Sequence, residues 1–145
     1  MAEFRTYGGD DPEVRALQAV MPRTQFLLCE HVLGRWQQAG LTLRPARRGF
    51  ALRAPHGERL TTVAWIYGPD RRHDDPRLEV ALNLLLRRGV PPDYLEALRD
   101  DLARFPTAAP RPDAPLLELP ITDGLGREDM ERLAGVLVQF GRSLA

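Results

Sequence analysis

The stretch "GFALRAPHGERLTTVAWIY", residues 49–67, decides the fold of this chain. Its second half is rich in the β-branched and aromatic residues that strands favour, and its first half alternates apolar and polar positions. The "PHGE" segment between the two halves is typical of a turn. We therefore predict an antiparallel hairpin, with one strand in residues 49–54 and the next in residues 59–67.

The second strand of this hairpin has two largely apolar faces. One face holds Leu60, Thr62, Ala64 and Ile66, and the other holds Thr61, Val63, Trp65 and Tyr67. Apolar residues on both faces favour a central strand that is covered on each side. The alternative is that Trp65 and Tyr67 are partly exposed and form a dimer or partner surface, because aromatic residues are enriched at interfaces.

The rest of the chain predicts helices and two further strands. Helical spacing of apolar residues, with capping and stop signals, predicts helices over residues 10–21, 23–40, 75–89, 91–105 and 126–144. Short strands are expected in residues 41–44 and 116–121, with Pro120 placing the latter at a sheet edge or ending it. Residues 106–115 form a proline-rich connection.

This order, ααβββααβα, predicts an α+β fold with a mostly antiparallel sheet of about four strands packed by helices. The length of 145 residues suits a single domain over residues 1–145.

An Asp-Asp-Pro motif occurs twice, at residues 10–12 and 74–76, each time after a Tyr-Gly break and before an apolar run. Asp at a cap and Pro at the first helical position are typical of a helix start. We therefore interpret the second motif as a helix entry. The alternative, a metal or acid–base site at residues 70–75, is disfavoured because adjacent side chains point in different directions. The inserted Arg71, Arg72 and His73, which the first motif lacks, are the candidate functional part of this loop.

Composition limits the classes of protein that fit. Hydrophobic residues make up 43% of the chain and charged residues 28%, which fits a globular protein. No apolar run reaches the length of a membrane span, and the N-terminus does not resemble a signal peptide. We therefore expect a protein that does not enter a membrane. Because a single cysteine allows no internal disulfide, we also expect a cytoplasmic location.

Missing residue types exclude several kinds of chemistry. The chain has no lysine, so it has neither the lysine of a Walker-type phosphate loop nor a side-chain amine for Schiff-base catalysis. Its only serine, Ser143, lies three residues from the C-terminus, and Cys29 has the helical position of a core residue. We therefore expect a non-catalytic protein without metal or cofactor. The alternative is an enzyme built from Asp, Glu, His, Arg and Tyr alone.

Charge is unevenly spread although the net charge is zero. Residues 44–77 are rich in arginine, and residues 93–131 are rich in carboxylates. The two regions can neutralise each other within the fold or across a dimer. The alternative is a basic surface for a phosphate backbone, since arginine offers a planar fork of donors. The arginines concerned are Arg44, Arg47, Arg48, Arg53, Arg59, Arg71 and Arg72.

The predicted order of helix, three antiparallel strands, helix and strand over residues 24–121 resembles the restriction-endonuclease-like core. That resemblance implies an acidic residue on the second strand and an acid-x-lysine on the third. Here those strands read "GFALRAP" and "RLTTVAWIYGP", without a carboxylate or a lysine. The resemblance therefore implies, at most, a degenerate nuclease-like core without its active site.

Together these observations predict a binding protein that associates with itself as a homodimer or with another protein. A nucleic-acid-binding protein that uses the arginine-rich hairpin is the alternative. The candidate binding residues are Arg47, Arg48, Arg53, Arg71, Arg72, His73, Trp65 and Tyr67. Whether His31, His56 and His73 meet in space does not follow from the sequence.

Overall fold

The structure is a computed structural model that describes residues 5–108 and 116–145. Its elements are α1 (Pro12–Ala19), α2 (Arg23–Gln38), β1 (Thr42–Ala46), β2 (Gly49–His56), β3 (Arg59–Tyr67), β4 (Arg77–Ala81), α3 (Leu82–Arg87), α4 (Pro92–Ala103), β5 (Leu116–Pro120) and α5 (Arg127–Ser143). The predicted α+β class is confirmed. Most of the predicted proline-rich connection lies outside the described residues.

The five strands form one antiparallel sheet in the order β1-β2-β3-β4-β5. The predicted hairpin of residues 49–67 supplies β2 and β3, the second and third strands of this sheet. Its outermost strands, β1 and β5, contain Pro45 and Pro120 respectively. Because proline has no backbone N–H, it is tolerated at sheet edges, which matches the edge position expected for Pro120.

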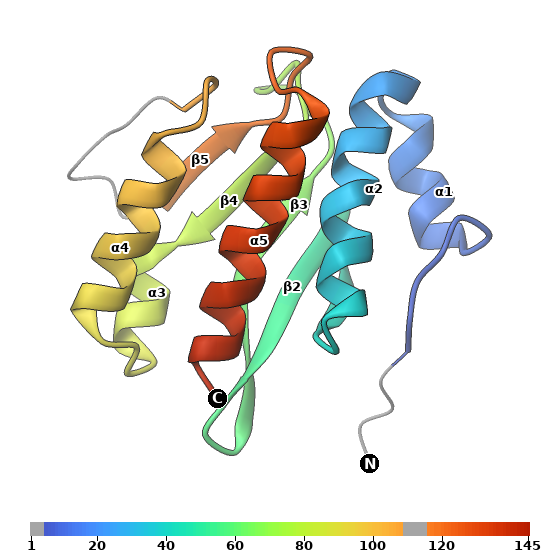
Figure 1. Ribbon diagram of the computed structural model, residues 1–145. Coiled ribbons are helices and arrows are strands. Elements are labelled where there is room, and N and C mark those ends of the chain that lie inside the picture. Colours follow the sequence, from blue (N-terminus) through green and yellow to red (C-terminus); the bar gives the residue numbers. More distant parts are fainter. Residues whose placement is uncertain (1–4, 109–115) are drawn as a thin grey trace.

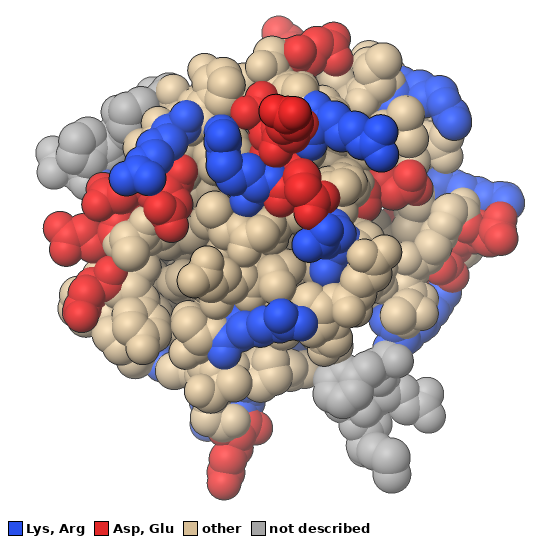
Figure 2. Space-filling model, in the orientation of Figure 1, with Lys and Arg blue, Asp and Glu red and all other residues tan. Residues whose placement is uncertain are grey.

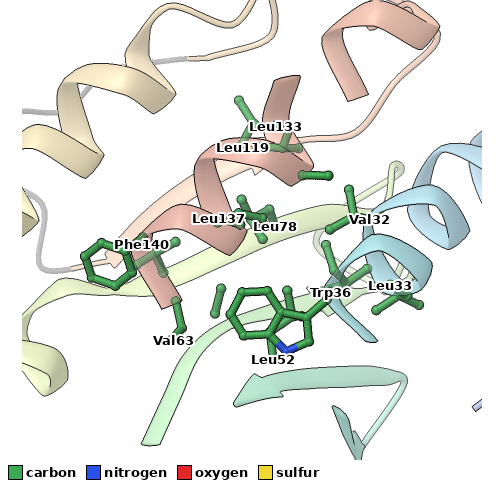
Figure 3. Close-up of a cluster of buried hydrophobic side chains, with 14 of the residues drawn as sticks. Val32, Leu33, Trp36, Leu52, Val63, Leu78, Leu119, Leu133, Leu137 and Phe140 are labelled. Atoms are coloured by element: carbon green, nitrogen blue, oxygen red, sulfur yellow. The ribbon is translucent and has the colours of Figure 1, made fainter. Parts of the chain in front are cut away.

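Helices α2, α4 and α5 lie on the same side of the sheet, and α1 packs beside α2 (Figure 1). The core fills the space between these helices and the sheet. Trp36 of α2 and Leu137 of α5 are fully buried there against Leu52 and Leu78 of the strands (Figure 3). The indole N–H of Trp36 donates a hydrogen bond to the carbonyl of Thr42, which ties α2 to β1.

The opposite side of the sheet has no helix over it in the described parts of the chain (Figure 1). The prediction that β3 is covered on both sides is therefore wrong. Apolar residues on both faces of a strand indicate two faces that avoid water, but they do not show what covers each of them.

The predicted helix of residues 75–89 is also wrong in its first half. Residues Arg77–Ala81 form β4, and the helix begins only at Leu82. The sequence "RLEVALNLLL" fits both the strand and the helix period, so the local pattern is ambiguous. Pairing decides it, because Leu78 lies opposite Ile66 and Leu119 in the sheet and is fully buried there.

This extra strand changes the element order and gives five strands rather than about four. Strand β3 is followed directly by an antiparallel neighbour rather than by a helix. The order on which the resemblance to the restriction-endonuclease-like core depended is therefore not the observed one.

The two Asp-Asp-Pro motifs have different structural roles. Helix α1 begins at Pro12, as predicted, but the Asp11 carboxylate accepts hydrogen bonds from the Gly8 N–H and from Arg5 rather than capping the helix. The second motif leads into β4, and Asp75 accepts a hydrogen bond of 3.0 Å from the side-chain amide of Gln25. The interpretation of residues 74–76 as a helix entry is wrong.

Candidate functional site

The uncovered side of the sheet is the candidate site, and we call it the open face. Strand register sets its composition, because residues paired across neighbouring strands point to the same side. One row across the five strands consists of Arg44, Ala51, Trp65, Glu79 and Glu118. The row on one side of it contains Thr42, Arg53 and Thr62. The row on the other side contains Ala46, Gly49, Tyr67, Arg77 and Pro120.

Trp65 and Tyr67 lie two residues apart on β3, the middle strand of the open face, and Tyr67 is the last residue of that strand. Their rings are nearly parallel, with centroids 6.4 Å apart and an interplanar angle of 8°. Both side chains are half-buried. The two aromatics therefore form one stacked apolar pair on the middle strand of the sheet.

Val63 does not continue this aromatic stripe, although strict alternation predicts that it should. The pairing between β2 and β3 shifts by one residue, from Leu52 opposite Ala64 to Arg53 opposite Thr62. Val63 is thus the extra residue of a β-bulge, which reverses the alternation along β3. Its side chain is fully buried on the helix side, as is that of Ala64.

An ion-pair network borders the aromatic pair. Arg77 is the hub: its guanidinium bonds Asp70 at 3.2 Å and Glu79, and lies 5.1 Å from the Tyr67 ring centroid. The Arg77 side chain is only 10% exposed. Burial, reinforced by the nearby Glu79 carboxylate, raises the pKa of Tyr67, so its hydroxyl stays protonated.

Asp70 holds the loop between β3 and β4 in place. Its carboxylate accepts hydrogen bonds from the backbone N–H groups of Arg72 and His73, at 2.8 and 2.9 Å. The Nδ1 atom of His73 lies 3.0 Å from the same carboxylate. These hydrogen bonds, the Arg72 N–H above all and with help from Arg77, hold the pKa of Asp70 well below its usual range.

His73 links this loop to the edge strand β5. While Nδ1 contacts Asp70, Nε2 lies 3.6 Å from the Glu118 carboxylate. The three histidines do not converge. His31 contacts Glu131 of α5, and the ring nitrogens of His56 lie 3.0 and 3.1 Å from the backbone carbonyls of Leu144 and Arg88.

The predicted arginines fall into two groups. Arg53 lies on the open face, where its guanidinium reaches the Leu60 carbonyl at 3.5 Å. Arg47 and Arg48 form the turn between β1 and β2, and the Gly68 N–H donates to the Arg48 carbonyl at 2.9 Å. That contact brings the turn beside the loop that carries the other two exposed arginines, Arg71 and Arg72.

The structure therefore places Arg53, Trp65 and Tyr67 on the open face and His73 at its border. The other four predicted residues gather at one end of the sheet. Sequence reasoning missed Arg77, Glu79 and Glu118 as parts of the site. The alternation within "RLEVA" is the available signal for the first two, but the same residues also fit the period of a helix.

Several other kinds of site are not supported. In residues 5–108 and 116–145, no group of His, Cys, Asp and Glu side chains could hold a metal ion. Burial raises the pKa of the Cys29 thiol to about 12, so it is an inert core residue, as expected. None of the described helices is long and apolar enough to cross a membrane.

A pocket between α4 and α5 is too small to suggest a ligand site. It has a volume of about 220 Å³ and is lined by residues such as Tyr94, Asp101 and Gln139. Pockets for small molecules usually enclose about 300 to 1,000 Å³.

Comparison with known proteins found no matching family model, no matching curated protein and no matching solved structure. Any function of this chain is therefore inferred from its own residues.

Proposed function

We propose that this chain is a non-catalytic binding protein that associates with a second copy of itself through the open face. The observation that carries the proposal is the half-buried Trp65–Tyr67 pair on the middle strand of a sheet face that no described helix covers. The single cysteine fits a cytoplasmic location.

The physical reason is the apolar area that the face leaves in water. Two sheets can pack face to face at about 10 Å, with side chains of both faces interdigitating. Large aromatic side chains are the residues most enriched in interfaces. Around the pair lie small side chains, including Ala51 and Ala46, which leave room for a partner to approach.

The edges of the sheet offer a poorer route to association. A sheet edge recruits another strand through unpaired backbone N–H and C=O groups. Pro45 in β1 and Pro120 in β5 each remove a donor from the edge strands. The open face is therefore favoured over addition of a strand to either edge.

Nucleic acid fits the same region less well. Arg47, Arg48, Arg71 and Arg72 are exposed and make no ion pair with described residues. However, the exposed carboxylate of Asp74 shares their loop, and the exposed carboxylate of Glu118 lies on the open face. These carboxylates would repel phosphates, so nucleic acid binding is an outcome to test rather than the conclusion.

The test is sedimentation velocity over a hundredfold range of protein concentration. We expect the unmodified chain to shift from monomer to dimer, and the Trp65→Thr/Tyr67→Thr variant to stay monomeric, with strand propensity preserved by threonine. Tyr94→Ala is the matched control, because Tyr94 is 42% exposed but lies on α4, away from the open face. A wild-type chain that stays monomeric at every concentration would overturn the proposal.

A parallel measurement addresses nucleic acid. Fluorescence anisotropy with mixed-sequence DNA and RNA at low and physiological salt should show no binding. Tight binding with a steep salt dependence, lost in Arg47→Ala/Arg48→Ala, would replace self-association by nucleic acid binding as the function.

A further inference from the structure

Charge on the open face is sorted by strand. In the row through Trp65, the cation lies on β1 and both carboxylates lie on β4 and β5: the order is Arg44, Ala51, Trp65, Glu79, Glu118. A further cation, Arg53, lies on β2, again on the β1 side of Trp65. Arg77 also lies on β4, but it is paired with Glu79 and Asp70, so the remaining charge is basic toward the β1 edge and acidic toward the β5 edge.

The two outer charges of this row are available to a partner. Arg44 is exposed and makes no ion pair with any described residue. Glu118 is 45% exposed, and its ion-pair partner among the described residues is His73, at 3.6 Å. By contrast, Glu79 is already neutralised by the buried Arg77.

We infer that a second copy of the chain binds the open face. The two copies are related by a two-fold axis that runs parallel to the strands along β3, so that Arg44 pairs with Glu118 of the partner subunit. This inference depends on the proposed self-association and adds its orientation. An isologous dimer needs a surface that is complementary to itself, and a face that is basic on one side and acidic on the other meets that need.

The direction of the axis follows from the row of charges. An axis parallel to the strands reverses the strand order, which places β1 of one copy over β5 of the other and stacks β3 on β3. The aromatic centres then meet, and each Arg44 faces Glu118 of the partner subunit. An axis across the strands would instead place Arg44 over Arg44 and Glu118 over Glu118, and such like-charge contacts oppose binding.

The size of the face sets the strength of the dimer. Five strands about 4.8 Å apart and about 17 Å long present a footprint of roughly 300 to 400 Å² per copy. Stable interfaces bury about 800 Å² per partner. We therefore expect a reversible dimer that dissociates on dilution rather than an obligate one.

The experiment is a charge swap followed by sedimentation velocity. Arg44→Glu alone and Glu118→Arg alone should each weaken dimerisation about tenfold, because each creates two like-charge contacts per dimer. Arg44→Glu/Glu118→Arg in one chain should restore it. An equimolar mixture of the two single variants should form a heterodimer, since each brings the charge that the other requires.

Control variants distinguish a failure of this orientation from a failure of the proposed self-association. Glu96→Arg and Arg104→Glu change net charge equally at exposed positions at α4 and should leave dimerisation unchanged. Circular dichroism checks that every variant is folded, and Glu118→Gln provides a milder change. Suppose that Trp65→Thr/Tyr67→Thr abolishes the dimer but the single charge variants do not weaken it. Suppose instead that neither the double charge variant nor the mixture of single variants restores dimerisation. In either case this orientation is wrong and self-association stands. A monomeric wild type would overturn both.

Discussion

The two faces of the sheet differ in how far their side chains are buried. On the helix side, Phe50, Leu52 and Ile66 are completely buried. On the open face, Trp65 and Tyr67 keep part of their surface in water. The first face supplies the apolar burial that stabilises the fold, while the second leaves apolar surface whose burial could stabilise an association.

Charge differs between the two sides as well. Figure 2 shows the helix side, where arginines and carboxylates are intermixed over the surface. On the open face, by contrast, Trp65 lies between Arg44 and Arg53 on one side and Glu118 on the other, while Arg77 and Glu79 pair with each other. Intermixed charge suits a solvated surface, whereas separated charge gives a face a preferred orientation toward a partner.

The largest expected effect is loss of a core aromatic on the helix side. Phe50→Ala should reduce the free energy of unfolding by about 3 to 5 kcal/mol, because it removes a fully buried ring and leaves a cavity. Denaturant unfolding of the monomer measures this. If Trp65→Thr, on the other face, costs as much, the two faces do not differ as described.

Removal of the Arg77 guanidinium should be the next largest change. Arg77→Met leaves the Asp70 and Glu79 carboxylates facing one another at a poorly hydrated site and should cost about 3 kcal/mol. Arg77→Lys, which retains the charge, should cost less. Equal losses in the two variants, measured by denaturant unfolding, would show that the network contributes through packing alone.

The pH dependence of stability should reveal Asp70. Its pKa is depressed in the folded chain, so its ionised form stabilises the fold above the usual carboxyl pKa of about 4. That contribution falls as pH drops through the lower folded pKa. The Asp70→Asn variant should therefore be less stable than wild type at neutral pH, and the difference should shrink in acid. A difference that is constant from pH 7 to pH 2 would contradict this assignment.

The smallest expected effect on folding belongs to Arg44. Because its side chain is exposed and unpaired among the described residues, Arg44→Ala should change the free energy of unfolding by no more than about 0.5 kcal/mol. Denaturant unfolding under monomeric conditions checks this value. A large loss would mean that Arg44 serves the fold rather than a partner.

Local pattern predicted much of the fold. The β2–β3 hairpin, α2, α4 and α5 follow from alternation and helical spacing in their own sequences. Strand β4 does not, because "RLEVALNLLL" satisfies both periods and only its pairing with β3 and β5 decides between them. The bulge at Val63 is likewise set by cross-strand register, which no local alternation reveals.

The candidate site was predictable only where it depends on the local pattern of one strand. Trp65 and Tyr67 were found because they alternate along one strand. The network around Arg77 does not follow from the sequence, since the pattern of residues 77–81 also fits a helix. The opposition of Arg44 and Glu118 depends on strand order, which the sequence pattern left open.

The most direct measurement uses the two tryptophans of the unmodified chain. Trp36 is fully buried in the core and Trp65 is half-buried on the open face, so collisional quenching by iodide at constant ionic strength reports mainly on Trp65. Self-association through the open face predicts that the quenching constant falls as protein concentration rises, in step with dimer formation. A quenching constant that stays unchanged while the dimer forms would contradict the account.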